Sequence, residues 1–309
     1  MSGNTRIKRF FAGLGLIMLV LILGYLVIRP FHLRWGATTV EVSQRMPGDL
    51  EHIGWTRAIT MEATPEEIWP WLVQWGQGRG GWYSYDWLEN LFGFDIHTTD
   101  RILPEYQDLK IGDPICMSSR FCPNRVTVLE PNRWLSWQAD DENGDPVWTF
   151  TFGLATVDDS HTRLIVRESF DNSFMPPAAV FVLEIPDAVM ELKALNTVKE
   201  RAEGIPQSIF ITPLEIILWF TALAVCLIAL VLFTSHSDGK QFLTLSIASV
   251  AVLMSITFLF PPHWLRIVLD LGLLAGLFWV TRQRVTQIST SLNPSHYAGG
   301  KVDKYHVNQ

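Results

Sequence analysis

The sequence predicts an α+β domain, in which a curved antiparallel sheet surrounds one long C-terminal helix, joined to about four transmembrane α-helices. Two observations lead to this fold class. The first is a set of four apolar runs, each about as long as the hydrocarbon core of a bilayer requires. The second is the order of elements between the first and second runs: a strand, two short helices, several short strands and one long helix.

The apolar runs account for a hydrophobic fraction of 48% and a mean hydropathy of +0.18, which are high for a purely soluble protein. Residues 10–28, 216–235 and 242–260 contain no charge. About 20 residues at 1.5 Å each span a bilayer core, so each run predicts a membrane helix. The fourth run, 264–281, is less apolar because Arg266 and Asp270 lie near its start.

The first run resembles a signal peptide because basic residues precede it. It is too long for a typical signal, and the following Arg29-Pro30-Phe31-His32 is not a small-residue cleavage site, so we expect an uncleaved anchor. The expected organisation is an anchor over residues 1–30, a lead-in over 31–56, the α+β domain over 57–204, a three-helix transmembrane region over 212–281 and a disordered tail over 282–309.

The charges are unevenly divided. Residues 31–211 hold 14 Lys and Arg against 27 Asp and Glu, whereas the rest of the chain holds 10 against 4. An acidic domain repels a phosphate backbone, so we expect no nucleic-acid partner. Lys and Arg in the short loops favour cytoplasmic termini and an extracytoplasmic domain, by a modest margin. The sequence therefore predicts a multi-pass protein of the plasma membrane, with the bilayer as its first partner.

The three cysteines give limited information. Cys226 lies within an apolar run, where packing explains it. Cys116 and Cys122 flank five residues and either form a disulfide across a hairpin, which would fit a compartment outside the cytoplasm, or are two unrelated buried thiols. No C-x-x-C pair is present, so structural zinc is not expected.

The acidic domain begins with an alternating strand at 57–63 and a helix that starts at Thr64. Thr64-Pro65-Glu66-Glu67 has the spacing of a capping box with proline at the first helical position. A second short helix is expected at 84–91 and a loop at 94–112. The remaining predicted elements are strands at 114–118, 124–130, 134–139, 147–157 and 163–170, and a helix at 185–202.

This order and several phrases within it resemble the SRPBCC superfamily, which contains START-like, polyketide-cyclase-like and pollen-allergen-like helix-grip proteins. The matching phrases are Ala-Thr-Pro-Glu-Glu-Ile-Trp-Pro-Trp-Leu at 63–72, the stretch 74–90 with its Gly-Arg-Gly-Gly-Trp-Tyr core, and Gly-Asp-Pro at 112–114. Trp134, Trp137 and the closing Lys-Glu-Arg-Ala-Glu at 199–203 also fit. The resemblance covers about residues 57–204 and implies a helix-grip fold with an apolar cavity for a lipid or another hydrophobic molecule.

Residues 76–81 read Gly-Gln-Gly-Arg-Gly-Gly and satisfy the G-x-G-x-x-G spacing of a dinucleotide loop. Such a loop needs a preceding strand and an acidic residue about 20 positions further on, whereas here a capped helix precedes it. We therefore expect no cofactor and a tight turn whose glycines adopt positive φ. Arg79 and the neighbouring aromatics are expected at the mouth of the cavity.

The candidate ligand-binding residues are large aromatics with polar tips and two arginines. Such rings more often belong to a core, but they also suit a cavity for an amphipathic ligand. Arg167 would need a carboxylate or an anionic head group if it points inward, and it is equally compatible with the solvent face. The candidates are Arg79, Trp82, Tyr83, Tyr85, Trp87, Trp137 and Arg167.

The sequence leaves the enzymatic question open. His97, Asp100 and Glu105 share a loop without a second histidine, so no metal site is expected, and no G-x-S-x-G motif is present. The favoured function is a membrane-anchored domain that binds a lipid or other hydrophobic molecule beside the bilayer. The alternatives are a cyclase- or hydrolase-like enzyme, and a non-catalytic interaction or sensory module. Gly272 and Gly276 have G-x-x-x-G spacing, which suits a helix–helix partner.

Overall fold

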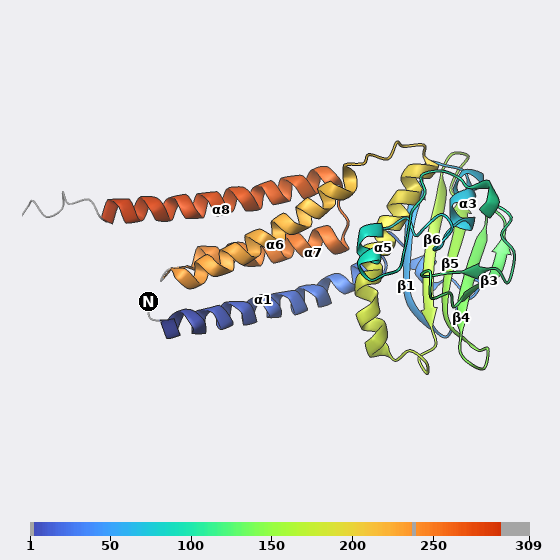
Figure 1. Cartoon of the computed structure of the whole chain (residues 1–309), viewed down its shortest axis with the longest axis horizontal. Coiled ribbons are helices and arrows are strands. Elements are labelled where there is room, and N and C mark those ends of the chain that lie inside the picture. The colour runs from blue at the N-terminus through green and yellow to red at the C-terminus, as the bar shows by residue number, and fades with distance from the viewer. Residues whose placement is uncertain (1–2, 237–238, 292–309) are drawn as a thin grey trace, which may run out of the picture. The chain divides into compact units, whose positions relative to one another are not determined.

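The computed structural model describes residues 3–236 and 239–291. Within these ranges it is an α+β structure with a six-stranded antiparallel sheet and eight α-helices, four of them long and apolar (Figure 1). The chain divides into two compact units. Unit 1 comprises Met1–Ile22, Leu218–Leu253 and Pro262–Gln309, and unit 2 comprises Leu23–Ile217 and Met254–Pro261.

The four long apolar helices coincide with the four predicted membrane runs. They are α1 (Gly3–His32), α6 (Ile211–Ser235), α7 (Lys240–Phe258) and α8 (His263–Ser291), and by length and composition each is able to cross a membrane. The helix α8 continues past residue 281, where the sequence predicted a disordered tail to begin. The rest of that predicted tail, 292–309, lies outside the described residues.

The two glycines of the G-x-x-x-G pair in α8 have different surroundings. A Cβ added to Gly276 would lie 3.2 Å from Leu245 of α7, whereas one added to Gly272 would meet nothing within 4 Å. Gly276 therefore allows close approach of α8 to α7 inside unit 1. The structure gives Gly272 no such contact.

The sheet of unit 2 is a meander to which the first strand is added at one edge. Its order is β1-β6-β5-β4-β3-β2, with every neighbouring pair antiparallel. The strands match the predicted ones closely, except that β1 begins earlier and β2 is short. They are β1 (His52–Met61), β2 (Pro114–Ile115), β3 (Asn124–Glu130), β4 (Trp134–Asp140), β5 (Pro146–Thr156) and β6 (Thr162–Phe170).

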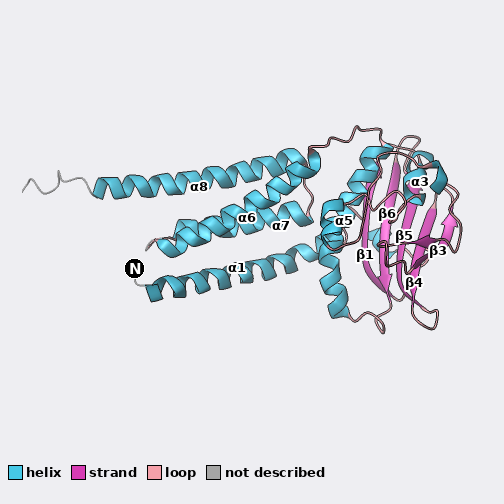
Figure 2. Ribbon diagram, in the orientation of Figure 1, coloured by secondary structure: helices cyan, strands magenta, loops and turns pink. Residues whose placement is uncertain are grey.

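One long helix, α5 (Pro177–Ala202), packs across one face of this sheet, which we call the inner face (Figure 2). Leu195 and Val198 of α5 share a buried core with Ile59 and Met61 of β1. The sequence predicted this helix from residue 185, but it begins directly after Pro176. Proline at the first helical position costs no hydrogen bond, so the pair of prolines starts the helix instead of delaying it.

The opposite, outer face of the sheet is covered by the lead-in segment. The sequence predicted an extended chain over 31–56, whereas α1 continues to His32 and a short helix, α2 (Thr39–Ser43), follows. Thr38 and Glu41 form a capping box on α2. Beyond α2, the Pro47 carbonyl accepts a hydrogen bond from the Thr151 hydroxyl at 3.1 Å, which fixes the segment to β5.

The glycine stretch forms the tight turn that the sequence predicted. It links α3 (Pro65–Val73) to α4 (Asp86–Leu91), and Gly76 and Gly81 pair through two backbone hydrogen bonds of 2.9 and 3.1 Å. Both residues have positive φ, and a Cβ on Gly81 would lie 2.6 Å from the Cα of Thr98. A side chain at this position is therefore excluded by both conformation and space.

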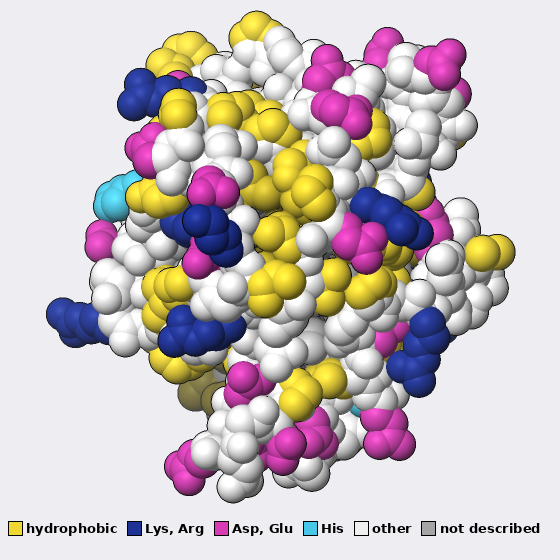
Figure 3. Space-filling model, turned by 90° about the vertical axis from the view of Figure 1, so that its right-hand side faces the viewer, with side chains coloured by type: hydrophobic (Ala, Val, Ile, Leu, Met, Phe, Trp, Pro, Cys, Tyr) yellow, Lys and Arg dark blue, Asp and Glu magenta, His cyan; other side chains and the backbone are white. Residues whose placement is uncertain are grey.

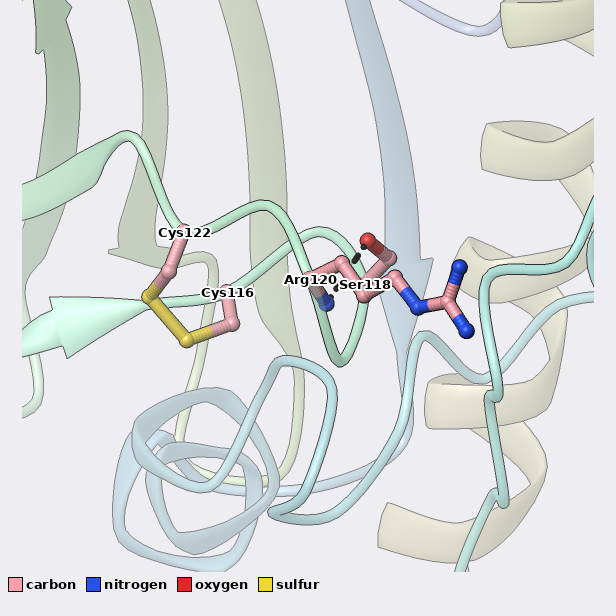
Figure 4. Close-up of a disulfide and its surroundings, with 4 residues drawn as sticks. All are labelled: Cys116, Ser118, Arg120 and Cys122. Atoms are coloured by element: carbon pink, nitrogen blue, oxygen red, sulfur yellow. Dashed lines mark hydrogen bonds between the residues drawn. A yellow bond between two sulfur atoms is a disulfide. The ribbon is translucent and has the colours of Figure 1, made fainter.

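Cys116 and Cys122 form a disulfide, which Figure 4 shows closing a short hairpin loop after β2. Inside the loop, the Arg120 backbone N–H donates to the Ser118 hydroxyl at 3.3 Å. The carbonyl of Cys116 accepts a hydrogen bond from the Gln77 N–H at 3.0 Å, so the loop is fastened to the glycine turn. Of the two alternatives left open by the sequence, the structure has the bridge.

The end of the molecule at which Figure 1 draws the sheet has a mixed surface. Hydrophobic side chains gather in the middle of the face in Figure 3, and acidic and basic side chains are spread around them. The excess of acidic residues in the domain therefore forms no continuous acidic field on this face.

Candidate functional site

A row of aromatic rings lies on the inner face of the sheet, between the glycine turn and strands β4 and β5. The ring centroids of Trp75 and Trp82 are 6.3 Å apart, and Trp75 lies 4.9 Å from Phe152. Phe152 lies 5.3 Å from Trp137, which stacks on Phe150 at 5.0 Å. Because even-numbered residues of β5 and odd-numbered residues of β4 point to this face, the alternation of the strands builds the row.

Polar atoms in this row have no partner within the protein. The indole N–H groups of Trp75, Trp82 and Trp137 are buried without an acceptor. Asn124 of β3 is fully buried, and neither its amide nitrogen nor its amide oxygen has a partner. A buried polar group without a hydrogen bond costs roughly 1–3 kcal/mol, so such groups in a native interior require an explanation.

Tyr83, by contrast, is buried with its hydroxyl bonded. It donates to the carbonyl of Trp71 at 3.1 Å and accepts from the Gln74 side chain at 2.9 Å. Burial raises the pKa of Tyr83 to about 12. Its backbone has φ of 56°, a conformation that non-glycine residues adopt at a cost. Tyr83 is therefore the anchor of the glycine turn beneath the aromatic row.

The remaining predicted site residues are divided among three places. Arg79 packs its guanidinium 4.6 Å over the Tyr106 ring and donates to the Val73 carbonyl at 3.0 Å. Tyr85 is buried against α5, with the Lys193 ammonium 5.4 Å from its ring. Trp87 is 37% exposed on α4. The structure brings Trp82, Tyr83 and Trp137 into one core and leaves Tyr85 and Trp87 outside it.

Arg167 points to the outer face of the sheet. Its guanidinium pairs with Asp49 at 2.9 Å and donates to Thr56 and to backbone carbonyls of the lead-in. Both partners of the ion pair are almost fully buried. The carboxylate that an inward arginine was expected to need is therefore present, but it lies under the lead-in and away from the aromatic row.

A second polar group on the inner face, which we call the ionic cluster, consists of Arg57, Glu168, Asp187 and Glu191. Arg57 of β1 is completely buried, and its Nη1 lies 2.6 Å from Asp187 and 2.8 Å from Glu191, both on α5. Carboxylate oxygens of the three acids lie within 4.8 Å of one another. Trp148 donates its indole N–H to Glu168 at 2.6 Å, and its ring lies 6.2 Å from Phe150, which connects the cluster to the aromatic row.

The electrostatics of the ionic cluster favour bound protons. Burial, followed by repulsion from Asp187 and Glu191, raises the pKa of Glu168 well above its ordinary value. Burial also raises the pKa of Glu191 to about 8, although the Arg57 charge opposes the shift. Glu168 and Glu191 therefore both have pKa values shifted in the direction that favours the protonated form. Oxygen ligands at this spacing also suit a hard cation, but Arg57 already supplies positive charge to two of them.

Sequence reasoning missed the ionic cluster, although a signal for it exists. Asp187 and Glu191 lie four residues apart on the helix that the sequence predicted over 185–202, so both point to the same side of it. Acidic residues on the buried side of a helix need a cation nearby. Arg57 is a candidate because it alternates with apolar residues on the first strand. In the loop after α4, His97 is largely exposed and contacts Asp95 at 3.2 Å.

Comparisons with known proteins give structural likenesses only. No family model and no curated protein matches the chain. A protein from Mesorhizobium loti is similar at 15% identity and a TM-score of 0.29, over 49% of this chain and 99% of its own. A conserved protein of unknown function from Enterococcus faecalis is 14% identical at a TM-score of 0.29, over 64% and 85%. A protein from Thermobifida fusca is 14% identical at a TM-score of 0.28, over 49% and 94%.

Proposed function

We propose that the chain is a membrane-anchored helix-grip domain of the SRPBCC kind that binds a lipid or another hydrophobic small molecule on the inner face of its sheet. One observation carries the proposal: the aromatic row contains buried indole N–H groups and a buried asparagine amide that have no partner in the protein. Apolar rings with a few polar groups among them are the usual lining of a ligand site.

The same observation describes the chemistry of the ligand. The rings of Trp75, Trp137 and Phe152 favour an apolar body by area burial. The unpartnered groups offer mostly donors, so a ligand with carbonyl, ether or hydroxyl oxygens recovers the free energy lost when these groups were buried. An entirely saturated hydrocarbon would leave them unpaired and is a poorer fit.

The position of α4 supports uptake from the bilayer. This helix and the following turn expose four large apolar side chains: Trp87, Leu91, Phe92 and Phe94. Two hydrogen bonds between Asn90 and Ile96, of 2.8 and 2.6 Å, hold this turn in shape. Exposed apolar patches of this kind occur at sites of membrane contact.

Contacts within unit 2 relate this segment to a membrane-spanning helix. Tyr85, which precedes α4, lies against Lys193 of α5, and Lys193 pairs with Glu215 in the first turns of α6 at 2.9 Å. These contacts connect the residue before α4 to the first turns of α6 through Lys193. The domain is proposed to lie outside the cytoplasm, in line with its disulfide.

Native mass spectrometry of the full-length protein, released from detergent and followed by lipid extraction, tests the proposal. We expect one hydrophobic molecule bound per chain. Asn124→Leu removes both unpartnered amide atoms and is expected to lower occupancy several-fold. Asn143→Leu, in an exposed turn, serves as the matched control. A chain that releases no molecule, and that takes up none when long-chain amphiphiles are added, would contradict the proposal.

The ionic cluster favours a second candidate function, acid–base catalysis on the bound molecule by an enzyme of the cyclase or hydrolase kind. Burial raises the pKa of Glu168, which favours a group able to donate a proton, and Asp187, the most exposed acid of the cluster, reaches solvent. Incubation of the protein with its copurified ligand, followed by mass spectrometry, tests this candidate. A mass change that disappears in Asp187→Asn would support it, and an unchanged ligand in the natural chain would exclude it for that ligand.

A further inference from the structure

Arg201, near the end of α5, is a partly buried cation that lacks a counter-ion among the described residues. Its Nε and Nη1 atoms are buried and have no hydrogen-bond acceptor. It forms no ion pair within 4 Å among the residues that the structure describes. Because burial of an unpaired charge is costly, this guanidinium requires an explanation.

The surroundings of Arg201 hold it in place without neutralising it. Its guanidinium carbon lies 4.9 Å over the ring of Tyr83 and 5.4 Å over the ring of Trp71. These aromatic faces orient the group and attract it weakly. Burial lowers the pKa of Arg201, and this exceeds the opposing influence of Tyr83 and of the more distant Asp100 and Asp86.

Two of the three acids that influence Arg201, Asp86 and Glu200, accept hydrogen bonds from other residues. Asp86 accepts hydrogen bonds from the Thr98 N–H at 2.7 Å and from the Thr98 hydroxyl at 2.6 Å. These contacts direct its carboxylate toward the turn after α4. Glu200, the neighbour of Arg201 in the chain, accepts a hydrogen bond from Gln207 at 2.8 Å.

A second arginine contributes positive charge on the same side of the domain. Arg79 also has a buried, unpartnered Nε atom and forms no ion pair within 4 Å among the described residues. Arg79 and Arg201 both lower the pKa of Tyr83, so both guanidinium groups act on the same phenol. Tyr83 is therefore influenced by two arginines that form no ion pair within 4 Å among the described residues.

We propose that Arg201, with Arg79 as a more distant second charge, binds an oxyanion, such as a carboxylate or a phosphate, and that in the bound ligand this oxyanion is the polar head. The inference rests on the proposed function, since it names the class of hydrophobic ligand as acidic. Tyr83 and Trp71 belong to the same core as the aromatic row, so a head at Arg201 directs an apolar body along that row. A charge-assisted hydrogen bond in a partly dry site is about twice as strong as a neutral one.

The test compares two probes of equal chain length, oleate and oleyl alcohol, on the full-length protein in lipid nanodiscs. The variants are Arg201→Gln and, as the matched loss of an exposed arginine, Arg133→Gln, whose side chain is 67% exposed. We expect the natural chain to bind oleate about tenfold more tightly than oleyl alcohol. Arg201→Gln should remove this preference and leave the binding of oleyl alcohol unchanged, and Arg133→Gln should behave as the natural chain does.

Inorganic phosphate alone, followed by thermal unfolding, forms the second arm and separates a lipid head from a free anion. If phosphate stabilises the natural chain and not Arg201→Gln, while neither oleate nor oleyl alcohol binds, the anion site stands and the proposed hydrophobic ligand is wrong. If both amphiphiles bind equally and Arg201→Gln changes neither, the anion site is wrong and the proposed function stands. If no probe binds, both are wrong.

Discussion

The two faces of the sheet differ in how completely the nitrogens of their arginines are hydrogen-bonded. On the outer face, Arg167 donates from Nε to Thr56 at 2.9 Å, from Nη1 to Gln44 and Asp49, and from Nη2 to carbonyls of α2, so every nitrogen has an acceptor. On the inner side, Arg57 keeps an unpartnered Nη2, and Arg201 keeps an unpartnered Nε and Nη1.

This difference separates two kinds of buried polar group. Those with hydrogen-bond partners in the protein stabilise the fold, and those without partners are able to bind a ligand. The outer face continues its satisfied pattern beyond Arg167: Ser136 and Thr151 share a hydrogen bond of 2.8 Å, and Thr149 and Ser169 share one of 2.6 Å. The inner face instead accumulates unpartnered indoles and an unpartnered amide. A fully bonded network stabilises the native state, whereas a half-bonded one gains free energy when a ligand completes it.

Loss of the outer arginine should give the largest effect on stability. Arg167→Ala leaves Asp49 buried without its cation, and breaking a buried pair in this way typically costs about 3–5 kcal/mol. Chemical denaturation of the detergent-solubilised protein measures the loss, and affinity for the inner-face ligand should not change while the protein is folded. Arg163→Ala, which breaks a more exposed pair with Glu41, is the control and should cost about 1 kcal/mol. Equal losses would show that burial does not set the difference.

The ionic cluster of the inner face should make stability fall as pH rises. Burial raises the pKa of Glu191 from 4.5 to about 8, so the folded chain keeps a proton that the unfolded chain releases. The stabilisation is fully present below about pH 4.5 and is lost as pH increases to about 8. Glu191→Gln should flatten this dependence and stabilise the protein at pH 8, because glutamine has no proton to lose on folding or unfolding.

Thermal unfolding between pH 5 and pH 8 provides the measurement. The exposed Glu130→Gln is the control and should follow the pH profile of the natural chain. If Glu191→Gln shows the same pH profile as the natural chain, Glu191 is ionised in the folded protein over this whole pH range, and it binds no proton on folding.

The sequence predicted features that depend on local patterns. The apolar runs, the capping box at Thr64, the turn of glycines at 76–81 and the meander of strands all follow from spacing along the chain, and the structure contains each of them. The start of α5 was wrong because two adjacent prolines suit a helix start as well as a break.

The polar contacts depend on register between distant segments, and a single sequence does not contain that register. Arg57 meets Asp187 across 130 positions, and Arg167 meets Asp49 across 118. Whether Arg167 pointed inward or outward was undecidable from alternation, because Glu168 beside it is buried as well. When both faces of a strand are buried, neither set of alternating side chains is consistently polar, so the sequence does not show which set faces the core. Here the lead-in buries the outer face.

The smallest expected effects come from two tryptophans of the inner face that differ in one hydrogen bond. Trp148→Phe removes an N–H that bonds to Glu168 and should destabilise the protein by about 1–2 kcal/mol. Trp137→Phe keeps an aromatic ring against Phe150 and removes an N–H without an acceptor, so without ligand it loses packed ring volume but no hydrogen bond. Denaturation of the delipidated protein measures both.

The order of the two effects should reverse for ligand affinity. Trp137→Phe should lower the affinity more, because its unpartnered indole N–H is the group proposed to bind the ligand. If Trp137→Phe destabilises the empty protein as much as Trp148→Phe, the indole of Trp137 already has a partner, such as a buried water, and the contrast between bonded and unbonded groups does not mark a binding site.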